Sequence, residues 1–564
     1  MDAATSVITT DFDLVCERSS QGRYDYVIIG SGLGGGILAR QLANQKMRVL
    51  LVEKGGVTFS THCLNTSRPH FQIGGVLGPS QDNDVVFNAN KAKVQTAAGS
   101  DPYVGGPVYC LGGRTTVWGL FVPKVDRDTY KQFFPKKITD YLDGTGYTDA
   151  FNLVTHGSQS FTSIYPKSVI NASELSTTET ELNGALKAFY GKYYKDEPVP
   201  TVDIAPVAIE FNSPSPYVFP RGAYSTVDAL LDKAHARDPY LTVLLNTEAL
   251  QVSFNDKTTK SSTTSTPYKA SSVTVRTTTD KRSGSLLASK GFILCAGAIG
   301  TAQISLNSGL QNLHRLVGKG LTDHEIWGVR FIKEKDETLK DPLKLQSLIT
   351  VCDEPALLNV VVNANTFFGR GPAVFTPPTQ SFNKNKNVIE TNPAGWSDKD
   401  PQEYDTVNIT LEFRAELYDE SEVLDVASSD PVIRAKRLAP HMDEKCQKEM
   451  QRLATEIRNR ILKIDDNCTK APRLSLAGFG VVAHEVGTMR LQGPDPHSGK
   501  GYVVDDMYRV RGFSNLYVCD LSIFPVSPPA NPSLTLAALA LQLAKNLVKQ
   551  KDKGAQGRDC KDEE

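Results

Sequence analysis

The stretch "YDYVIIGSGLGGGILARQLANQKMRVLLVEKGG", residues Tyr24–Gly56, decides the fold. Residues 26–29 form a short apolar run rich in β-branched residues, which is typical of a buried parallel strand. Gly30, Gly32 and Gly35 follow as G-x-G-x-x-G, then a helical pattern, then a second apolar run that ends at Glu53. Such glycines permit a tight turn, close approach of the backbone to a pyrophosphate, and contact between helix and strand. The stretch therefore predicts a dinucleotide-binding βαβ unit in which Glu53 accepts a ribose hydroxyl.

Taken alone, a G-x-G-x-x-G sequence is weak evidence, since a glycine turn without a ligand has the same letters. Its position between a strand and a helix, with a carboxylate at the expected distance, favours nucleotide binding. The pattern leaves NAD and FAD open. Glu53 argues against NADP, because the extra phosphate of NADP prefers an arginine.

Length and composition bound the class of protein. A chain of 564 residues predicts two domains. The net charge is -1, so the chain has no excess of positive charge that would favour binding to nucleic acid or to an anionic membrane. Nine cysteines without a C-x-x-C pair predict reduced thiols rather than a disulfide framework, and the first twenty residues lack a secretory signal. These features predict a cytoplasmic protein.

Glycine-rich segments divide the chain. "VYCLGGRTTVWGLFVPKV" (108–125) and "KGFILCAGAIGTAQISLNSG" (290–309) continue the glycine-rich pattern, the second as a strand, a turn and a helix. Segments 131–205 and 325–470 lack these glycine patterns, and the second carries strand-like runs such as "VNITLEFRAELY" (407–418). We therefore predict an α/β protein with a Rossmann-like FAD-binding domain and an α+β substrate domain built on an antiparallel sheet. The predicted boundaries are 22–130, 206–324 and 471–550 for the FAD-binding domain, 131–205 and 325–470 for the substrate domain, and 1–21 and 551–564 for flexible termini.

The segment "VSPPANPSLTLAALALQLAKNLV" (526–548) is long and uncharged up to Lys545. Four prolines in the wider run from Leu521 forbid one continuous membrane span, and only about 15 residues after Pro532 can be helical, fewer than the roughly 20 that a bilayer needs. Asn531 suits an N-cap and Pro532 the first turn. The segment predicts a proline-rich loop followed by a buried helix.

The glycine turn with Glu53, together with "GGRTTVWG", "HEVGTMR" and "ANPSLTLAALALQLA", resembles the glucose-methanol-choline (GMC) flavoprotein oxidoreductases. The resemblance covers the flavin domain well and the substrate domain poorly. Within the family, the pairing of His484 with Asn531 and the T-x-W sequence after two glycines are most similar to the pyranose 2-oxidases. The resemblance implies FAD as cofactor, an alcohol as substrate, most simply a sugar or glycoside, oxygen or a quinone as electron acceptor, and the possibility of a homo-oligomer. The cofactor-binding residues that it implies are Gly30, Gly32, Gly35, Glu53, Gly113, Thr116, Trp118, Asp520, Asn531, Pro532 and Ser533.

Alcohol oxidation needs a base at the hydroxyl group, because hydride leaves the carbon only when the hydroxyl proton is also removed. Histidine performs this task near neutral pH, and we assign it to His484. Asn531 would bind the same hydroxyl and fix the carbon over flavin N5. The alternatives are a structural histidine and an asparagine that only caps a helix. The helix after Pro532 would direct its positive end at the flavin.

One position departs from the family pattern. Pyranose oxidases often carry, between the residues equivalent to Thr116 and Trp118, a histidine bonded to the flavin, and this chain has Val117 there. We therefore predict non-covalent FAD. Asp323–His324, Cys110 and Cys295 are interpreted as structural, His62 and His70 have no assigned partner, and no spacing suggests a metal site.

The leading hypothesis is oxidation of a secondary alcohol of a pyranose or glycoside to a ketone. The rival enzyme hypotheses are a biosynthetic flavoprotein that oxidises a non-sugar alcohol and a dehydrogenase that uses a quinone-type acceptor. A flavin-binding scaffold without chemistry is the non-enzyme alternative, which the presence of both His484 and Asn531 disfavours.

Overall fold

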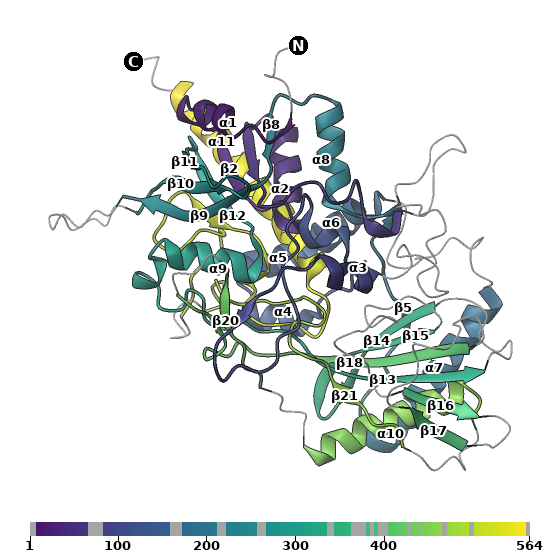
Figure 1. Cartoon of the computed structure of the whole chain (residues 1–564). Coiled ribbons are helices and arrows are strands. Elements are labelled where there is room, and N and C mark those ends of the chain that lie inside the picture. Colours follow the sequence, from purple (N-terminus) through teal and green to yellow (C-terminus); the bar gives the residue numbers. More distant parts are fainter. Residues whose placement is uncertain are drawn as a thin grey trace.

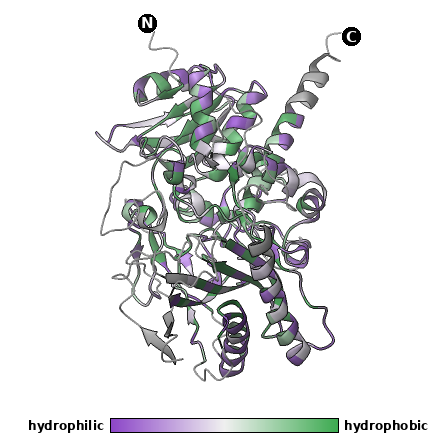
Figure 2. Cartoon of the chain, turned by 90° about the vertical axis from the view of Figure 1, so that its right-hand side faces the viewer, coloured by the Kyte–Doolittle hydropathy of each residue, from purple (hydrophilic) through white to green (hydrophobic). Residues whose placement is uncertain are grey.

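The computed structural model describes residues 7–65, 83–157, 172–210, 222–255, 267–334, 343–362, 379–383, 388–392, 404–425, 430–438, 443–464, 471–495 and 501–559. Two large sheets dominate the architecture, one in the upper half of Figure 1 and one in the lower right. Hydrophobic residues gather in the strands of both sheets (Figure 2).

The first sheet is six-stranded and entirely parallel. It combines segments from both ends of the chain, in the order β1 (Ile8–Thr9), β8 (Leu241–Leu244), β3 (Val49–Val52), β2 (Tyr26–Ile29), β12 (Gly291–Leu294) and β22 (Leu516–Val518). Helices α2 (Leu33–Asn44), α8 (Thr226–His235), α9 (Gly297–Asn307) and α11 (Ser533–Asp559) accompany it. The predicted Rossmann-like α/β class is confirmed.

The turn from β2 to α2 depends on glycine at two positions. Gly30 has φ +97°, and a Cβ there would lie 2.4 Å from the carbonyl oxygen of Cys295 on the neighbouring strand. A Cβ on Gly35 would lie 1.9 Å from the carbonyl oxygen of Gly30. The first turn of α2 therefore sits directly on the backbone of the turn that precedes it.

Substitution of Gly35 by alanine is expected to destabilise the fold by about 1–3 kcal/mol, because the added methyl group overpacks rigid backbone. The matched control is Gly32→Ala, since among the described residues no atom lies within 4 Å of a Cβ at Gly32. The free energy of unfolding of the two ligand-free variants, measured with denaturant, checks this. Equal stabilities for the two variants would contradict it.

The second sheet has eight strands and is antiparallel except for the pairing of β13 with β16. Its order is β17 (Val388–Asn392), β16 (Thr379–Asn383), β13 (Glu325–Glu334), β18 (Tyr404–Phe413), β15 (Glu354–Val362), β14 (Leu343–Val351) and β5 (Asp203–Ile204), with β21 (Ser475–Leu476) beside β13. Helices α7 (Ala172–Tyr193) and α10 (Glu444–Ile461) pack on one face of it. This is the predicted substrate domain with its antiparallel sheet.

The two faces of this sheet differ in chemistry, as strand alternation requires. The face beneath α7 and α10 is apolar, with residues such as Val329, Leu345 and Ile409 fully buried there. The opposite face carries polar side chains that line a cavity shared with the first domain: Lys344, Asn359, Asn408, Thr410 and Glu412. The polar face therefore forms one wall of a site.

Three small sheets and several short helices complete the fold. The sheets are β11 (Ser283–Leu286), β10 (Ala270–Thr277) and β9 (Thr247–Phe254); β19 (Glu422–Val423), β20 (Val432–Arg434) and β4 (Gln95–Thr96); and β6 (Ile209–Glu210) with β7 (Gly222–Ala223). The helices are α1 (Phe12–Ser20), α3 (Asn83–Asn90), α4 (Arg127–Phe133), α5 (Lys136–Tyr141) and α6 (Tyr147–Thr155).

The structure corrects three predicted boundaries. Residues 7–20 are ordered rather than flexible, because β1 extends the parallel sheet and Phe12 and Val15 of α1 are buried. Residues 131–155 belong to the first core, not to the substrate domain, since the apolar side chains of α5 and α6 pack there. Helix α11 runs to Asp559, so residues 551–559 are helical.

The apolar C-terminal segment is part of that core. Helix α11 begins at Ser533, so Pro532 precedes the first helical residue, and its apolar residues up to Leu547 are buried. None of the described helices is long and apolar enough to span a bilayer.

The cysteine prediction is wrong for one pair. Cys352 and Cys446 form a disulfide that joins the end of β14 to the beginning of α10, across 94 residues of sequence. The spacing of the cysteines carries no sign of this contact, because the sheet and helix are brought together only by the tertiary packing. Cys110 and Cys295, as predicted, are buried and free.

Candidate active site

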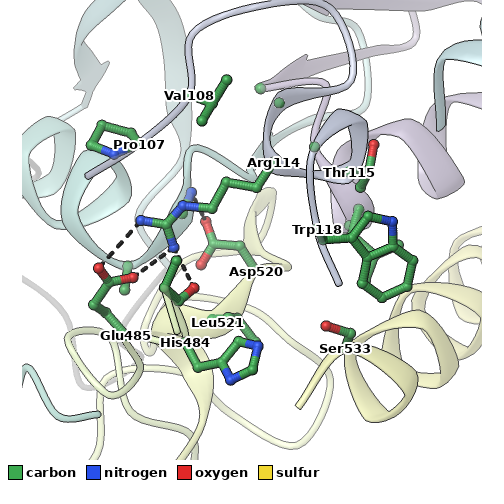
Figure 3. Close-up of a pocket in the computed structure, with 18 of the residues that line it drawn as sticks. Pro107, Val108, Arg114, Thr115, Trp118, His484, Glu485, Asp520, Leu521 and Ser533 are labelled. Atoms are coloured by element: carbon green, nitrogen blue, oxygen red, sulfur yellow. Dashed lines mark hydrogen bonds and ion pairs between the residues drawn. The ribbon is translucent and has the colours of Figure 1, made fainter. Parts of the chain in front are cut away.

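A cavity of about 1040 Å³ extends from the β2–α2 turn of the first domain to the polar face of the second sheet. Its size matches the upper end of the range for ligand pockets, about 300–1,000 Å³. Strand ends of the parallel sheet, the glycine-rich segment after Pro107 and the loop before α11 all contribute to it (Figure 3).

Glu53 closes the nucleotide end of the cavity. Its side chain is only 6% exposed, and its Oε2 accepts hydrogen bonds from Ser31 N at 3.0 Å and Ser31 Oγ at 2.5 Å. Burial raises the pKa of Glu53, and these hydrogen bonds oppose the rise. The carboxylate thus anchors the glycine turn and lines the cavity beside it.

Two cations near Glu53, Lys54 and Arg276, are both paired with the carboxylate of Glu248. Lys54 Nζ lies 3.3 Å from Glu248 Oε2, and Arg276 Nη2 lies 2.6 Å from Glu248 Oε1. The N-terminal amides of α2 face the cavity without a capping side chain, which suits a pyrophosphate.

The segment after Gly112 lies across the turn. Gly112 and Gly113 have φ +86° and +53°, and a Cβ on Gly113 would lie 3.4 Å from the Cα of Gly32. Trp118 and Val117 line the cavity. The hydroxyl of Thr116 instead donates to Gly113 O at 2.9 Å, so this predicted cofactor residue holds its own helical turn (Gly113–Thr116, η4) and does not line the cavity.

Asp520 joins two predicted motifs. Its Oδ2 accepts from Gly297 N at 2.9 Å and from Thr301 Oγ1 at 2.5 Å, and its Oδ1 accepts from Ser522 N at 2.9 Å. Burial raises its pKa, and these bonds oppose the rise. The carboxylate therefore fixes the turn between β12 and α9 against the segment that leads to α11.

His484 and Asn531 meet at the other end of the cavity. Asn531 Nδ2 lies 3.5 Å from His484 Nε2, and both residues line the cavity with Ser533 at the beginning of α11. A contact of this length is a weak hydrogen bond. A hydroxyl group between the two side chains could bond to both of them.

His324 sits behind His484 and determines its tautomer. His324 Nδ1 lies 2.7 Å from the carbonyl oxygen of Pro528, which can only accept, so this nitrogen carries the proton. In neutral His324 the other nitrogen, Nε2, is then an acceptor, and it lies 3.0 Å from His484 Nδ1. His484 Nδ1 must therefore donate, which leaves the lone pair of His484 Nε2 facing Asn531 and the cavity.

Electrostatics keep both imidazoles neutral. Burial lowers the pKa of His324 to about 4. Burial also lowers the pKa of His484 well below its ordinary value, and the positive charges of Arg114 and Lys344 lower it further. A neutral His484 with an unprotonated Nε2 is the form that a general base requires.

The loop that carries His484 is held by a buried ion pair. Arg114 Nη1 contacts Glu485 Oε2 at 2.6 Å and donates to Ala483 O at 2.5 Å, and the hydroxyl of Tyr103 donates to Glu485 Oε1 (Figure 3). Ala483 has φ +56°, a left-handed conformation that is unusual for alanine. Arg114 and Glu485 thus secure a strained residue directly before the histidine.

Most of the predicted site residues line one cavity. These are Gly30, Gly32, Glu53, Gly113, Trp118, His484, Asp520, Asn531 and Ser533, whereas Gly35, Thr116 and Pro532 lie behind it. His62 is a satisfied core residue, with Nε2 bonded to Trp118 O at 3.0 Å and Nδ1 to Leu64 N at 3.1 Å. His70 lies outside the described residues. Among those described, no cluster of His, Cys, Asp or Glu could hold a metal ion.

The site also contains five residues that were not predicted from the sequence as functional: His324, Arg114, Glu485, Lys344 and Glu412. His324 was interpreted as structural. Asp323, which accepts from Gly480 N at 2.8 Å, does stabilise the surrounding loop. The only available signal for Arg114 and Glu485 was their position inside two family motifs.

Two family models match the chain, both described as GMC oxidoreductase, over residues 220–326 and 398–540. The chain belongs to the GMC oxidoreductase family. This is a family of FAD-dependent oxidases and dehydrogenases, and the site of this GMC oxidoreductase fits FAD: the bare amides of α2, buried Glu53 and the open space at Gly32 all line one cavity. No curated protein sequence matches it.

Solved structures with the same fold include a formate oxidase, with a TM-score of 0.59, 14% identity and coverage of 94% of this chain and 99% of that one. They also include pyridoxine 4-oxidase from Mesorbium loti, with a TM-score of 0.54, 15% identity and coverage of 93% and 99%. At these identities the likeness concerns the fold alone. The predicted special similarity to pyranose 2-oxidase is not supported by either family match, so the assignment rests at the level of the family.

Proposed function

We propose that this GMC oxidoreductase oxidises a secondary alcohol of a pyranose or glycoside to a ketone, with His484 as the base. The observation that carries the proposal is the hydrogen-bond chain from Pro528 O through His324 to His484. It leaves the unprotonated Nε2 of His484 beside Asn531, inside the cavity.

In the proposed reaction, His484 Nε2 takes the proton of the substrate hydroxyl. The amide of Asn531 orients the same hydroxyl, and His324 Nε2 continues to accept from Nδ1–H of the imidazolium that forms. The β2–α2 turn and Glu53 would hold FAD, which would supply the acceptor for the hydride of the alcohol carbon, with oxygen or a quinone-type molecule as the final electron acceptor.

The polar wall supports a sugar as substrate. Lys344, Asn359, Asn408, Thr410 and Glu412 all line the cavity from the second sheet. A non-sugar alcohol is the second candidate, because Leu120, Phe121 and Val207 give the cavity an apolar side as well. Each candidate predicts a different set of substrates.

Anaerobic mixing of the FAD-loaded protein with sugars, glycosides and non-sugar alcohols such as pyridoxine, and with formate as a substrate that is not an alcohol, tests the proposal. Loss of the flavin absorbance near its visible maximum with a pyranose or glycoside supports a sugar substrate. Bleaching by non-sugar alcohols alone would overturn that part of the proposal. Admission of air or of a quinone then identifies the acceptor.

We also propose that FAD is bound without a covalent link. Val117 lines the cavity where some relatives carry a histidine, and a valine side chain has no nucleophile. Acid precipitation of the holoprotein is therefore expected to release all of the flavin into the supernatant, as measured by absorbance. Yellow colour that stays with the precipitated chain would contradict this prediction.

A further inference from the structure

The polar wall of the cavity contains two buried oxygens that lack donors. Glu412 Oε2 and Asn359 Oδ1 have no hydrogen-bond partner among the described residues, although the two side chains are only 6% and 3% exposed. The pair is internally connected, because Asn359 Nδ2 donates to Glu412 Oε1 at 2.9 Å. A buried acceptor without a donor destabilises the fold, and more so when it is charged, so most such groups have a partner.

The strand register places both oxygens on the cavity side of the sheet. Asn359 of β15 pairs with Thr410 of β18, so Glu412, two residues further along β18, is its diagonal neighbour on the same face. Both side chains line the cavity together with His484 and Asn531. The two acceptors therefore face the same cavity as the proposed base.

Lys344 adds a donor at another corner of this wall. It follows the first residue of β14, and its Nζ lies 3.6 Å from the centre of the Phe121 ring, which also lines the cavity. No direct hydrogen bond or ion pair joins Lys344 to Glu412 in the described part of the chain, yet the charge of each influences the pKa of the other. Burial lowers the pKa of Lys344 to about 8 and raises that of Glu412 to about 7.

We propose that Asn359 and Glu412 form a subsite that binds two neighbouring hydroxyl groups of the substrate, with Lys344 donating to a further oxygen of the same molecule. The inference rests on the proposed function, because another hydroxyl of the same substrate is the one that reacts at His484. A hydroxyl group suits this wall because it donates to one acceptor and can still accept from a cation. The subsite thus selects polyols over simple alcohols of the same size.

Three alcohols that share a six-membered carbon ring and differ in their number of hydroxyl groups test the subsite: cyclohexanol, cyclohexane-1,2-diol and cyclohexane-1,2,3-triol. Their dissociation constants are measured by calorimetry with the His484→Ala holoprotein, so that binding is observed without turnover. We expect the triol to bind about ten- to a hundredfold more tightly than cyclohexanol, because it forms two more hydrogen bonds with the polar wall. Equal affinities for the three alcohols would overturn the proposal.

Variants in the same background assign the preference to residues. Glu412→Leu is expected to remove the preference for the triol, and the near-isosteric Glu412→Gln, which puts an amide donor in place of one oxygen, to reduce it about fivefold. The matched control is Glu416→Gln, an exposed glutamate beyond the end of β18, which should retain the full preference. A preference that survives Glu412→Gln unchanged would overturn the assignment. Because binding is read without chemistry, failure of the subsite is distinguishable from failure of the oxidation itself, which the wild-type flavin absorbance reports.

Discussion

The His484→Ala variant is expected to bind FAD and to stay yellow under anaerobic conditions with every alcohol that bleaches the wild-type protein. Loss of a general base slows such reactions by about 10²–10⁴-fold, because the hydroxyl proton then has no acceptor in the transition state. Within the described residues, His484 is the histidine that faces the cavity with an unprotonated Nε2 beside Asn531. The measurement is the rate of flavin bleaching in a stopped-flow instrument.

A matched control separates loss of the base from general damage. His235 is exposed at the end of α8, far in sequence from the family motifs, and His235→Ala should bleach at the wild-type rate. If His484→Ala retained rapid bleaching, the base assignment would be refuted even with FAD bound in the expected way.

The second large effect is expected at His324, which we describe as a positioning residue. His324→Phe keeps the ring shape but removes the nitrogen that accepts from His484 Nδ1. The imidazolium formed during proton transfer then lacks this hydrogen bond, which is equivalent to about 1.5–3 kcal/mol, so kcat should fall about 10- to 100-fold. The KM should change little, because His324 lies behind His484 rather than against the substrate.

Rescue distinguishes positioning from a structural role. His324→Gln restores an acceptor oxygen near the position of Nε2, and it should recover part of the kcat that His324→Phe loses. Equal loss in both variants, with unchanged unfolding midpoints, would refute the positioning role.

The pH profile of the wild-type protein is a further readout of the histidine pair. The base acts when His484 Nε2 is unprotonated, and burial lowers the pKa of His484, so the active form persists into more acidic solution. The value of kcat, measured at saturating substrate so that substrate binding by Glu412 does not contribute, should therefore stay level as the pH falls through 6.5 and should decline only at lower pH. A decline centred at or above pH 6.5 would show that His484 behaves as an exposed histidine.

The sequence alone was sufficient for the elements that depend on local pattern. The run of apolar residues in β2, the glycines at the start of α2 and the carboxylate after β3 are consecutive in the chain, so their periodicity and spacing predict the unit that forms. The motifs around His484 and Asn531 also carry their own local signals. The family resemblance predicted that both residues bind the same hydroxyl group. In the structure their side-chain nitrogens lie 3.5 Å apart.

Contacts between distant segments were decided only by the tertiary structure. His324 reaches His484 across 160 residues, and Cys446 reaches Cys352 across 94. Strand β1 pairs with the distant β8, where Ile8 lies opposite Val243. No local periodicity encodes such contacts, because they depend on which strand faces which and in what register. The polar wall with Asn359 and Glu412 has the same origin. Strand alternation predicts two faces, but only the packing of α7 and α10 on one of them leaves the other facing the cavity.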